Sequence, residues 1–372
     1  MSCRHFGACG GCAYLDIPYE EELLLKERAL RDELGPLLEG VLPSPSPVRY
    51  RNKMELAFGD EGIGGRLALG IRKKRSMYEV APIDECALVP PEFALIAGVA
   101  ADYFREAGER FYHKRRRDGA LRHLTVRKGE FTGEALAMLS ATSGLSAPLE
   151  PLARALAGKL PGLVGFLSAA NDGVADVVRA EGARTIYGRN FYRERLLGLD
   201  FEVSIDSFFQ TNSGAAETLY RTVLEFAGGP GDLALDLYCG AGTITRAIAP
   251  LFARAVGIEL SEAAVESARR AAPANCEFHA GDVVKIMQEN RFAEPCLLVA
   301  DPPRDGLPPK VLPHIARLSP KKLVYVACKP KSLARDIPLL GEIGYGLARL
   351  KAVDMFPRTP HVEVVALFEA AP

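Results

Sequence analysis

Two side chains near the end of the chain have types and surroundings that suit covalent and acid–base chemistry. Cys328 follows the apolar run 324–327 and precedes a helical stretch, with Lys329 and Lys331 beside it. A helix N-terminus and nearby cations favour a thiolate over a thiol. Glu363 stands in an apolar segment, where a carboxylate needs a partner or a task. We interpret Cys328 as a nucleophile and Glu363 as a base.

Each of these residues also has a purely structural interpretation. A cysteine at the end of a strand is commonly a small buried hydrophobe. Glu363 could form an internal ion pair with Arg358 or Arg304. The elements that position the two residues therefore help to decide between the structural and the catalytic interpretation.

From Ser213 onward, the hydrophobic pattern alternates between short apolar runs and amphipathic stretches. Strands alternating with helices are typical of a mostly parallel, doubly wound sheet. The expected strands are 233–237, 255–258, 297–300 and 323–326, and the expected helices include 243–251, 261–271 and 332–340.

A glycine-rich turn follows the first of these strands, where a ligand would approach the backbone. Such turns also occur for geometry alone, but acidic residues end the next three strands. The turn lacks the third glycine of the dinucleotide fingerprint and no basic pyrophosphate pocket is evident, so S-adenosylmethionine is favoured over NAD. The candidate cofactor residues in this region are Tyr238, Gly240, Gly242, Glu259, Asp282 and Asp301.

The segments around Cys328 and Glu363, together with 208–212, 301–306 and 333–336, resemble the RNA 5-methyluridine methyltransferase family. The resemblance covers nearly the whole chain and is strongest to the iron-sulfur branch, which is similar to 23S rRNA uracil-C5 methyltransferases. It implies an α/β class I (Rossmann-like) methyltransferase domain with an N-terminal iron-sulfur-containing α+β RNA-binding domain.

The resemblance implies that Cys328 adds to C6 of uracil, that C5 takes the methyl group, and that Glu363 removes the C5 proton. It implies that Gln210 and Asp301 bind cofactor or base, and that Tyr238 and Glu259 bind the cofactor. The family usually has Asn after the nucleophile, whereas this chain has Lys329.

Three cysteines crowd the N-terminus and a fourth follows in the next segment. Four thiolates suit either zinc or an iron-sulfur cluster, and spacing alone does not choose. The resemblance favours a structural 4Fe-4S cluster, with zinc as the alternative and unliganded thiols a third possibility. The proposed ligands are Cys3, Cys9, Cys12 and Cys86.

The 372 residues have a formal net charge of -1, which argues against a basic coat over the whole surface. Two local basic runs, Arg72–Arg75 and Lys114–Arg117, are either solvated loops or, with Arg49, Arg51, Lys53 and Arg122, part of a phosphate-binding face. No signal peptide or membrane span is indicated, so we expect a cytoplasmic monomer.

The Pro/Ser stretch 43–47 predicts a stiff connector between two parts of the chain. We expect a segment 1–48 with the cysteines and a helix over 19–34, a central α+β RNA-binding domain over 49–206, and a methyltransferase domain over 207–372. The chain starts at the cysteines, so we expect no N-terminal β-barrel of the kind that some relatives carry.

The sequence does not name the RNA. Large-subunit ribosomal RNA is the first choice, because cysteine clusters go with that branch of the family, and transfer RNA is the second. A noncatalytic iron-sulfur RNA-binding protein is an alternative from another class. A DNA cytosine-type methyltransferase would carry its cysteine beside the fourth strand, where Asp301-Pro302-Pro303 has none.

Overall fold

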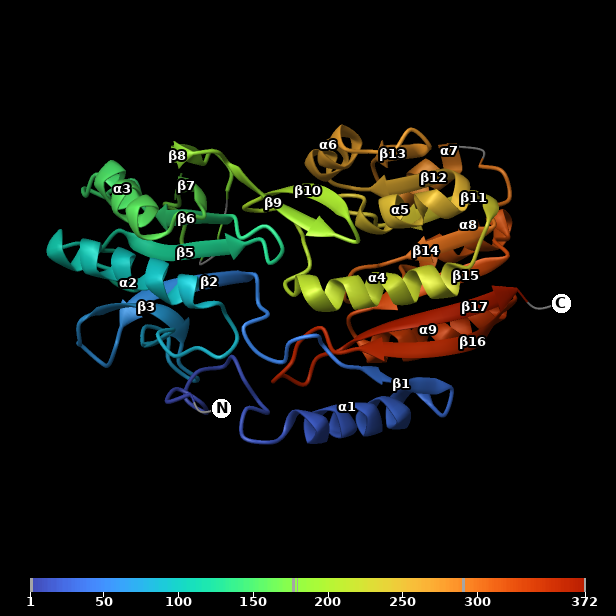
Figure 1. Ribbon diagram of the computed structural model, residues 1–372, viewed down its shortest axis with the longest axis horizontal. Helices are drawn as coiled ribbons and strands as arrows, with labels where there is room; N and C mark the ends of the chain where they lie inside the picture. The colour runs from blue at the N-terminus through green and yellow to red at the C-terminus, as the bar shows by residue number, and fades with distance from the viewer. Residues whose placement is uncertain (1–2, 176–177, 179, 290–291, 371–372) are drawn as a thin grey trace. The chain divides into compact units, whose positions relative to one another are not determined.

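The structure, a computed structural model, describes residues 3–175, 178, 180–289 and 292–370. The chain divides into two compact units, each built from two stretches of sequence (Figure 1). The first unit comprises Met1–Ile17 and Ser46–Ser213, and the second comprises Pro18–Pro45 and Gly214–Pro372. Residues 18–45 therefore group with the C-terminal half, whereas we expected them to belong to the segment 1–48 with the cysteines.

A largely antiparallel sheet forms the centre of the first unit. Its seven strands, among the described residues, follow the order β4-β3-β2-β5-β6-β7-β8, and only the β6–β7 pair is parallel. The strands are β2 (Lys53–Asp60), β3 (Leu67–Arg72), β4 (Val80–Pro82), β5 (Leu121–Lys128), β6 (Ala135–Ala141), β7 (Leu163–Ala170) and β8 (Arg184–Gly188).

Two helices and a hairpin complete the first unit. The helices are α2 (Pro91–Glu106) and α3 (Leu149–Lys159), and the hairpin pairs β9 (Phe191–Leu196) with β10 (Leu199–Ser204). Phe93, Phe104 and Leu152 from the helices are completely buried in one apolar cluster with strand residues. Removing this apolar surface from water holds the helices on the sheet.

The second unit contains the doubly wound sheet that the alternating pattern predicted. Its strand order is β1-β16-β17-β15-β14-β11-β12-β13, with β17 antiparallel to both of its neighbours. The strands are β1 (Leu38–Leu42), β11 (Gly231–Leu237), β12 (Phe252–Glu259), β13 (Cys276–Ala280), β14 (Leu297–Ala300), β15 (Lys322–Ala327), β16 (Tyr345–Val353) and β17 (Glu363–Ala370).

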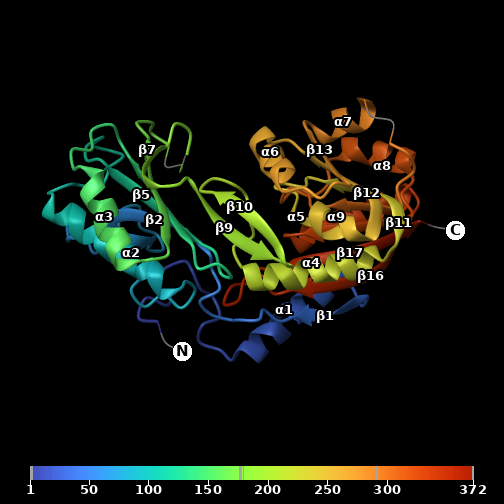
Figure 2. The same ribbon diagram turned by 45° about the horizontal axis from the view of Figure 1, so that its top comes forward.

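Helices cover both faces of this sheet (Figures 1 and 2). On one face lie α4 (Ser213–Ala227) and α5 (Thr243–Ile248), and the Arg349 guanidinium of β16 lies 4.5 Å from the centre of the Phe226 ring of α4. The other face carries α1 (Tyr19–Leu34), α7 (Val283–Glu289), α8 (Leu312–Leu318) and α9 (Pro330–Glu342), whose apolar side chains join one core cluster. The remaining elements are α6 (Glu262–Arg270) and the short 3-10 turns Ala249–Leu251 and Pro309–Val311.

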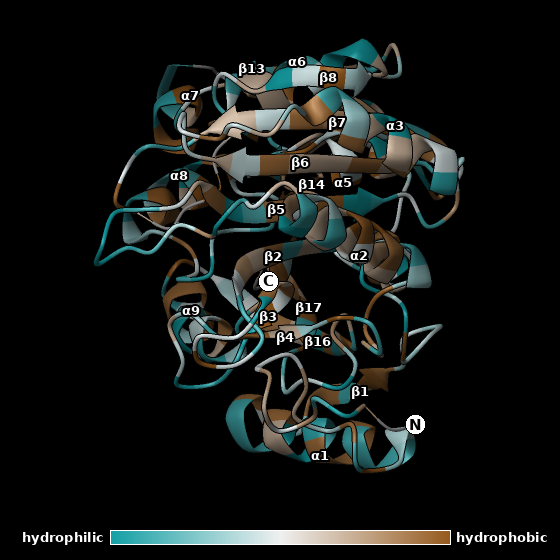
Figure 3. Ribbon diagram, turned by 90° about the vertical axis from the view of Figure 1, so that its left-hand side faces the viewer, coloured by the Kyte–Doolittle hydropathy of each residue, from teal (hydrophilic) through white to brown (hydrophobic). Residues whose placement is uncertain are grey.

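Helix α1 spans the predicted residues and ends at Gly35, whose φ of 85° suits a glycine. Figure 3 shows hydrophobic and hydrophilic residues alternating around this helix. Its buried stripe is not purely apolar, because Glu22 and Lys26 lie inside with Leu30 and Leu34. The fold must therefore supply partners for two buried charges.

Within the described ranges, no helix combines the length and the apolar character that crossing a bilayer requires.

Candidate active site

The register of three strands brings the predicted nucleophile and base together. In the parallel pair β14–β15, Ala300 lies beside Tyr325, so the residues that follow both strands emerge at one end of the sheet. Because β17 runs antiparallel to β15, Ala327 faces Val364. One residue further along this register come Cys328 and Glu363. The same end of the sheet therefore receives Asp301, Cys328 and Glu363.

Glu363 is a buried carboxyl in an acidic neighbourhood. Its side chain belongs to a residue only 4% exposed, and burial raises its pKa well above the usual range. The nearby charge of Asp301 raises that pKa further, whereas Arg304 lowers it. Desolvation raises the pKa of Asp301 to about 7, although that residue keeps partial access to solvent. Two carboxyl groups with raised pKa values thus lie close to each other.

The Cys328 thiol is half-buried at this edge, and its pKa is raised rather than lowered. Burial is the largest cause, followed by the negative charges of Glu363 and Asp301, while Arg304 acts in the opposite direction. Helix α9 does begin at Pro330, two residues after the cysteine. The expectation that this helix end, with Lys329 and Lys331, would favour the thiolate was therefore wrong about the net effect. The neighbouring cation that favours it is Arg304.

Helix α9 holds the loop that carries Arg304. The Ser332 hydroxyl donates to the Arg304 carbonyl over 2.8 Å, and the buried Asp336 accepts the Leu307 amide over 2.8 Å. Gly306 has a φ of 82°, and a Cβ there would meet Asp336 at 2.4 Å. The close approach of loop and helix explains the glycine at this position.

The glycine-rich turn after β11 is held open by its backbone conformation. Tyr238, Gly240 and Gly242 have positive φ values of 66°, 55° and 75°. A Cβ on Gly242 would lie 2.6 Å from the Phe278 ring, so only glycine fits. Tyr238 accepts a φ that is uncommon for a residue with a side chain, which is the kind of local strain that gathers at ligand sites.

Glu259 braces this turn from the end of β12. One carboxylate oxygen accepts the Gly240 amide over 3.1 Å, and the other accepts the Ser261 amide over 2.8 Å. Each carboxylate oxygen has further lone pairs, so these bonds leave acceptor capacity for the hydroxyls of a ribose. The predicted cofactor residues Tyr238, Gly240, Gly242 and Glu259 are thus brought together.

Asp282 lies at the same edge of the sheet, but its carboxylate already takes part in structural contacts. It accepts the Lys285 amide over 3.1 Å at the start of α7 and pairs with Lys310 over 3.3 Å. These contacts lower the pKa of Asp282, led by the Lys285 hydrogen bond. Burial, and then the charge of the nearby Asp282, raises the pKa of Tyr238 to about 12.

Gln210, the remaining predicted cofactor residue, belongs to the first unit. It is 7% exposed, and its backbone carbonyl accepts the Asn52 side-chain amide over 2.9 Å. These contacts organise the segment just before α4. Its role at the cofactor stays a prediction.

Sequence reasoning missed two buried groups near Asp301 and the glycine-rich turn. Asp236 of β11 is completely buried, accepts the Thr245 hydroxyl over 2.6 Å, and has a pKa raised to about 7 by burial. Tyr220 of α4 is hydrogen-bonded to Thr243, and its pKa is raised by burial and then by Asp301 and Glu363. An acid inside an apolar strand was a readable signal for Asp236, but nothing in the helical pattern marked Tyr220.

The predicted metal ligands lie in the first unit. Cys9 forms a backbone bridge with Lys73, and the Gly11 amide donates to the Cys9 sulfur over 3.4 Å. The pKa of Cys86 is raised by burial and then by Cys9 and Cys3, which lie near it, while the Leu88 and Val89 amides donate to its sulfur and oppose this rise.

These cysteines do not form a closed ligand set as they are placed. Across the described part of the chain, no three His, Cys, Asp or Glu side chains are arranged to hold a metal ion. The predicted iron-sulfur site is therefore not shown.

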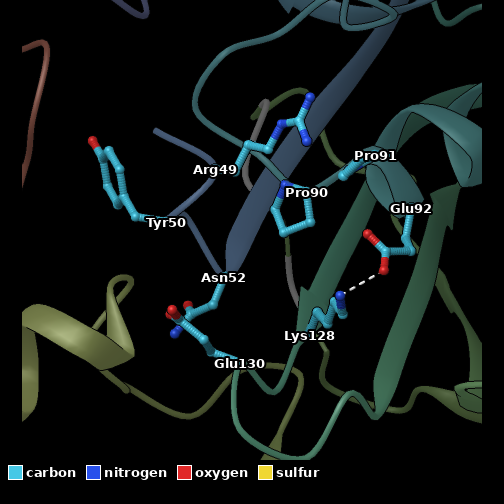
Figure 4. A pocket seen from close by; sticks show the side chains of 8 residues that line it. All are labelled: Arg49, Tyr50, Asn52, Pro90, Pro91, Glu92, Lys128 and Glu130. Atoms are coloured by element: carbon cyan, nitrogen blue, oxygen red, sulfur yellow. Dashed lines mark hydrogen bonds and ion pairs between the residues drawn. The ribbon is translucent and has the colours of Figure 1, made fainter. Parts of the chain in front are cut away.

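A small pocket of about 230 Å³ lies in the first unit, near the predicted RNA-binding residues Arg49 and Arg51 (Figure 4). Its walls carry both signs of charge, and Lys128 pairs with Glu92 over 2.6 Å. The lining residues are Arg49, Tyr50, Asn52, Pro90, Pro91, Glu92, Lys128 and Glu130. The acidic groups offset the cations, so this pocket is not strongly basic.

Comparisons with known proteins agree with the geometry of the second unit. Residues 234–298 match a family model described as a methyltransferase domain. A protein of Clostridium tetani described as an uncharacterized RNA methyltransferase is 42% identical over 98% of this chain and 82% of its own length. Another from Caldanaerobacter subterraneus is 41% identical, with 99% and 84% covered.

A solved structure also matches along most of the chain. It is the tRNA (uracil-54, C5)-methyltransferase of Pyrococcus abyssi in complex with S-adenosyl-L-homocysteine, with a TM-score of 0.79 and 29% identity. The match covers 97% of this chain and 86% of that one. Given the extent and identity of these matches, the chain belongs to the RNA methyltransferase family that its bacterial relatives represent.

Proposed function

We propose that this protein methylates C5 of a uracil in RNA, using S-adenosylmethionine. The observation that carries the proposal is the strand register that sets Cys328 opposite Glu363, at the sheet edge where Asp301 and the glycine-rich turn also lie. The Pyrococcus abyssi enzyme, whose name specifies uracil C5 and whose structure holds S-adenosyl-L-homocysteine, supports the choice of target atom and cofactor.

The residues around the turn fit an adenosyl group. Gly242 lets the turn pack against the buried Phe278 ring, where a Cβ would clash, and Glu259 offers carboxylate oxygens to ribose hydroxyls. When bound, the cofactor supplies a methyl group on a positively charged sulfur. We assign Tyr238, Gly240, Gly242, Glu259 and Asp301 to its binding, and retain Gln210 and Asp282 as further candidates.

Cys328 starts the reaction by forming a bond from its sulfur to C6 of the uracil ring. The electron pair of the C5–C6 double bond then becomes available at C5, which takes the methyl group; the methyl–sulfur bond of the cofactor would break and its electron pair would stay on the sulfur of the departing S-adenosylhomocysteine. Glu363 removes the C5 proton, the double bond re-forms, and the bond from Cys328 to C6 breaks, which restores the thiolate. The target nucleotide must leave its stack for this to happen.

The raised pKa values suit these roles when the groups are deprotonated. A carboxylate whose pKa is raised by burial is a stronger base than an exposed glutamate, and this favours proton removal by Glu363. Arg304 lowers the pKa of both Cys328 and Glu363, so it stabilises the two reactive anions. We assign it the task of keeping both groups in their reactive forms.

We propose 23S ribosomal RNA as the first substrate and transfer RNA as the second. The cysteine-rich N-terminus supports the first choice through the resemblance stated above. The structural likeness to a transfer RNA enzyme supports the second. The chemistry at Cys328 and Glu363 would be the same on either RNA.

A 4Fe-4S cluster, or zinc, bound by Cys3, Cys9, Cys12 and Cys86 remains a separate proposal. The proximity of Cys3 and Cys9 to Cys86 and the amides directed at two of the sulfurs support it, because backbone amides commonly surround such sulfurs. The check is iron, sulfide and zinc analysis of protein purified without oxygen, beside a Cys86→Ala variant. Protein with neither metal would contradict it.

The test of the catalytic proposal traps the covalent intermediate. Protein is incubated with S-adenosylmethionine and 5-fluorouridine-substituted ribosomal or transfer RNA, and a denaturing gel is used to look for a protein–RNA band. Fluorine at C5 cannot leave as a proton, so the adduct should persist. The band should vanish in Cys328→Ala. Absence of a band with every RNA would favour the noncatalytic RNA-binding alternative or another target atom.

A further inference from the structure

The two basic runs of the first unit are neighbours in space, although about 40 residues separate them in sequence. Tyr78, just after the first run, stacks on His113, just before the second, with ring centres 4.1 Å apart and planes 20° apart. Phe111 joins them, 6.0 Å from the Tyr78 ring. This aromatic contact fixes the two runs side by side. We call residues 72–75 and 114–117 the paired basic turns.

Each run is folded into a tight turn that presents its cations outward. The Ser76 amide donates to the Lys73 carbonyl over 3.1 Å in the first turn, and the Arg117 amide donates to the His113 carbonyl over 2.7 Å in the second. Arg75 and Arg117 have positive φ values of 62° and 57°. The backbone thus places an arginine at a defined bend in each turn.

Several cations of the paired basic turns lack an acidic partner. Lys74, Arg75, Arg115 and Arg117 are exposed, and within the described residues no ion pair involves them. By contrast, Lys73 pairs with Glu79 over 3.2 Å, and Arg116 pairs with Asp118 over 3.2 Å. Uncompensated cations held together repel one another, which favours an anionic ligand.

The first basic turn is also tied to the cysteine loop. The Lys74 amide donates to the Ala8 carbonyl over 2.9 Å, beside the backbone bridge between Cys9 and Lys73. The N-terminal loop therefore supports the backbone of the first turn. This contact restricts the turn before any ligand arrives, which lowers the entropy cost of binding.

We propose that the paired basic turns bind phosphates of the RNA substrate. The proposal rests on the proposed function for the identity of the ligand. Phosphate contacts position an RNA without reading its sequence, and each one releases a counterion. The surface should therefore govern affinity and its salt dependence, not the rate of the chemical step.

The experiment compares two triple variants of the full chain that remove equal charge. The test variant is Arg75→Gln, Arg115→Gln and Arg117→Gln. The control variant is Arg154→Gln, Lys159→Gln and Arg184→Gln, three exposed cations elsewhere in the first unit. Thermal unfolding of both variants checks folding. RNA affinity is measured at several salt concentrations, and single-turnover methylation is measured at saturating RNA.

The test variant should bind RNA at least about tenfold more weakly at low salt. Its plot of log affinity against log salt should lose roughly 2 to 3 in slope, while the methylation rate at saturation stays unchanged. The control variant should keep the parental slope. Equal losses in both variants, or an unchanged slope in the test variant, would overturn the proposal.

The two proposals fail in distinguishable ways. If the parent methylates RNA and the test variant keeps its salt slope, the paired basic turns are not the phosphate surface although the activity stands. If the test variant loses slope but the parent methylates no RNA, the surface stands and the catalytic proposal fails.

Discussion

Two groups of buried charge in the second unit are built on opposite plans. The matched cluster consists of Glu22, Lys26, Asp354 and Arg358. The Lys26 ammonium donates to Glu22 and to Asp354, each over 2.7 Å, and the Arg358 amide donates to Glu22 over 2.7 Å. Each acid therefore has a charged donor in direct contact.

The reactive cluster consists of Asp301, Arg304, Cys328 and Glu363. Here two carboxyls and a thiol share the influence of one exposed arginine. In the matched cluster, burial and, to a smaller extent, Asp354 raise the pKa of Glu22, but the Lys26 ammonium and the Arg358 amide oppose that rise through hydrogen bonds. At Glu363, Asp301 adds to the rise that burial causes, and Arg304 opposes it through its charge.

The difference separates a structural use of buried charge from a chemical one. A buried acid with a hydrogen-bonded cation is held in one ionisation state and one position. A buried acid beside another acid is costly to ionise, so its pKa is raised and it keeps its proton to higher pH than an exposed acid does. The matched cluster holds α1 against the segment 354–358, and the reactive cluster leaves its groups free to change protonation.

Removing the nucleophile should produce the largest effect. Cys328→Ala should lower methylation by at least roughly 10³-fold, because no adduct can form. Unfolding in urea should change little, because the thiol is only half-buried. The measurement is single-turnover methyl transfer. Retention of more than a tenth of the activity would mean that Cys328 is not the nucleophile.

Breaking the matched cluster should cost stability instead. Lys26→Met leaves Glu22 and Asp354 buried without their shared cation, so the free energy of unfolding should fall by about 3–5 kcal/mol. Urea unfolding measures this. Lys285→Met, which removes an exposed pair with Glu289, should cost at most about 0.5 kcal/mol. If both variants lost a similar free energy of unfolding, the buried ion pairs would not differ in their effect on stability from the exposed one.

Glu363→Gln should reveal the pH dependence of the reactive cluster. The folded pKa of Glu363 is raised, so the folded state binds the proton more tightly, and parental stability falls as pH rises from the unfolded pKa through the folded one. The variant lacks this loss. Relative to the parent, its unfolding free energy should therefore increase over that window by at least about 1.4 kcal/mol, the equivalent of one pKa unit.

Urea unfolding at a series of pH values measures this change. With ordinary uridine RNA, the same variant should accumulate the covalent adduct, because removal of the C5 proton is blocked. A stability difference that is constant with pH would contradict the raised pKa. An adduct that turns over at the parental rate would contradict the role as base.

Arg304→Gln should produce the smallest shift. Arg304 lowers the pKa of Cys328, so its loss should move the rise of adduct formation to higher pH. The check is adduct yield against pH at saturating RNA. Lys329→Asn is the control and should leave the profile within about twofold, because the charges with the largest influence on the thiol are those of Glu363, Asp301 and Arg304. If the pH profile shifted in Lys329→Asn and not in Arg304→Gln, Lys329 rather than Arg304 would be the cation that lowers the pKa of Cys328.

Much of the fold was readable because local patterns follow secondary structure closely. The expected helix over 19–34 and the expected strand 297–300 agree with α1 and β14. The connector at 43–47 contains the point where the chain passes from one unit to the other, between Pro45 and Ser46. Proline fixes φ and removes an amide donor, so such breaks are visible locally.

The return of residues 18–45 to the second unit was not readable. Strand β1 pairs with β16, with Leu38 beside Leu350, across more than 300 residues of sequence. Neither strand carries a local signal for its partner. The burial of Glu22 and Lys26 was not readable either, because their partners Asp354 and Arg358 come from the other end of the chain.

The sequence alone determined which residues can do chemistry, because a thiol after an apolar strand and an acid within one are local features. It also determined the doubly wound sheet, because periodicity follows from the backbone geometry of strands and helices. Only the tertiary structure decided the ionisation of these groups. The pKa of Cys328 depends on Glu363, Asp301 and Arg304, whose proximity comes from strand register, and charge interactions depend on distance rather than on sequence separation.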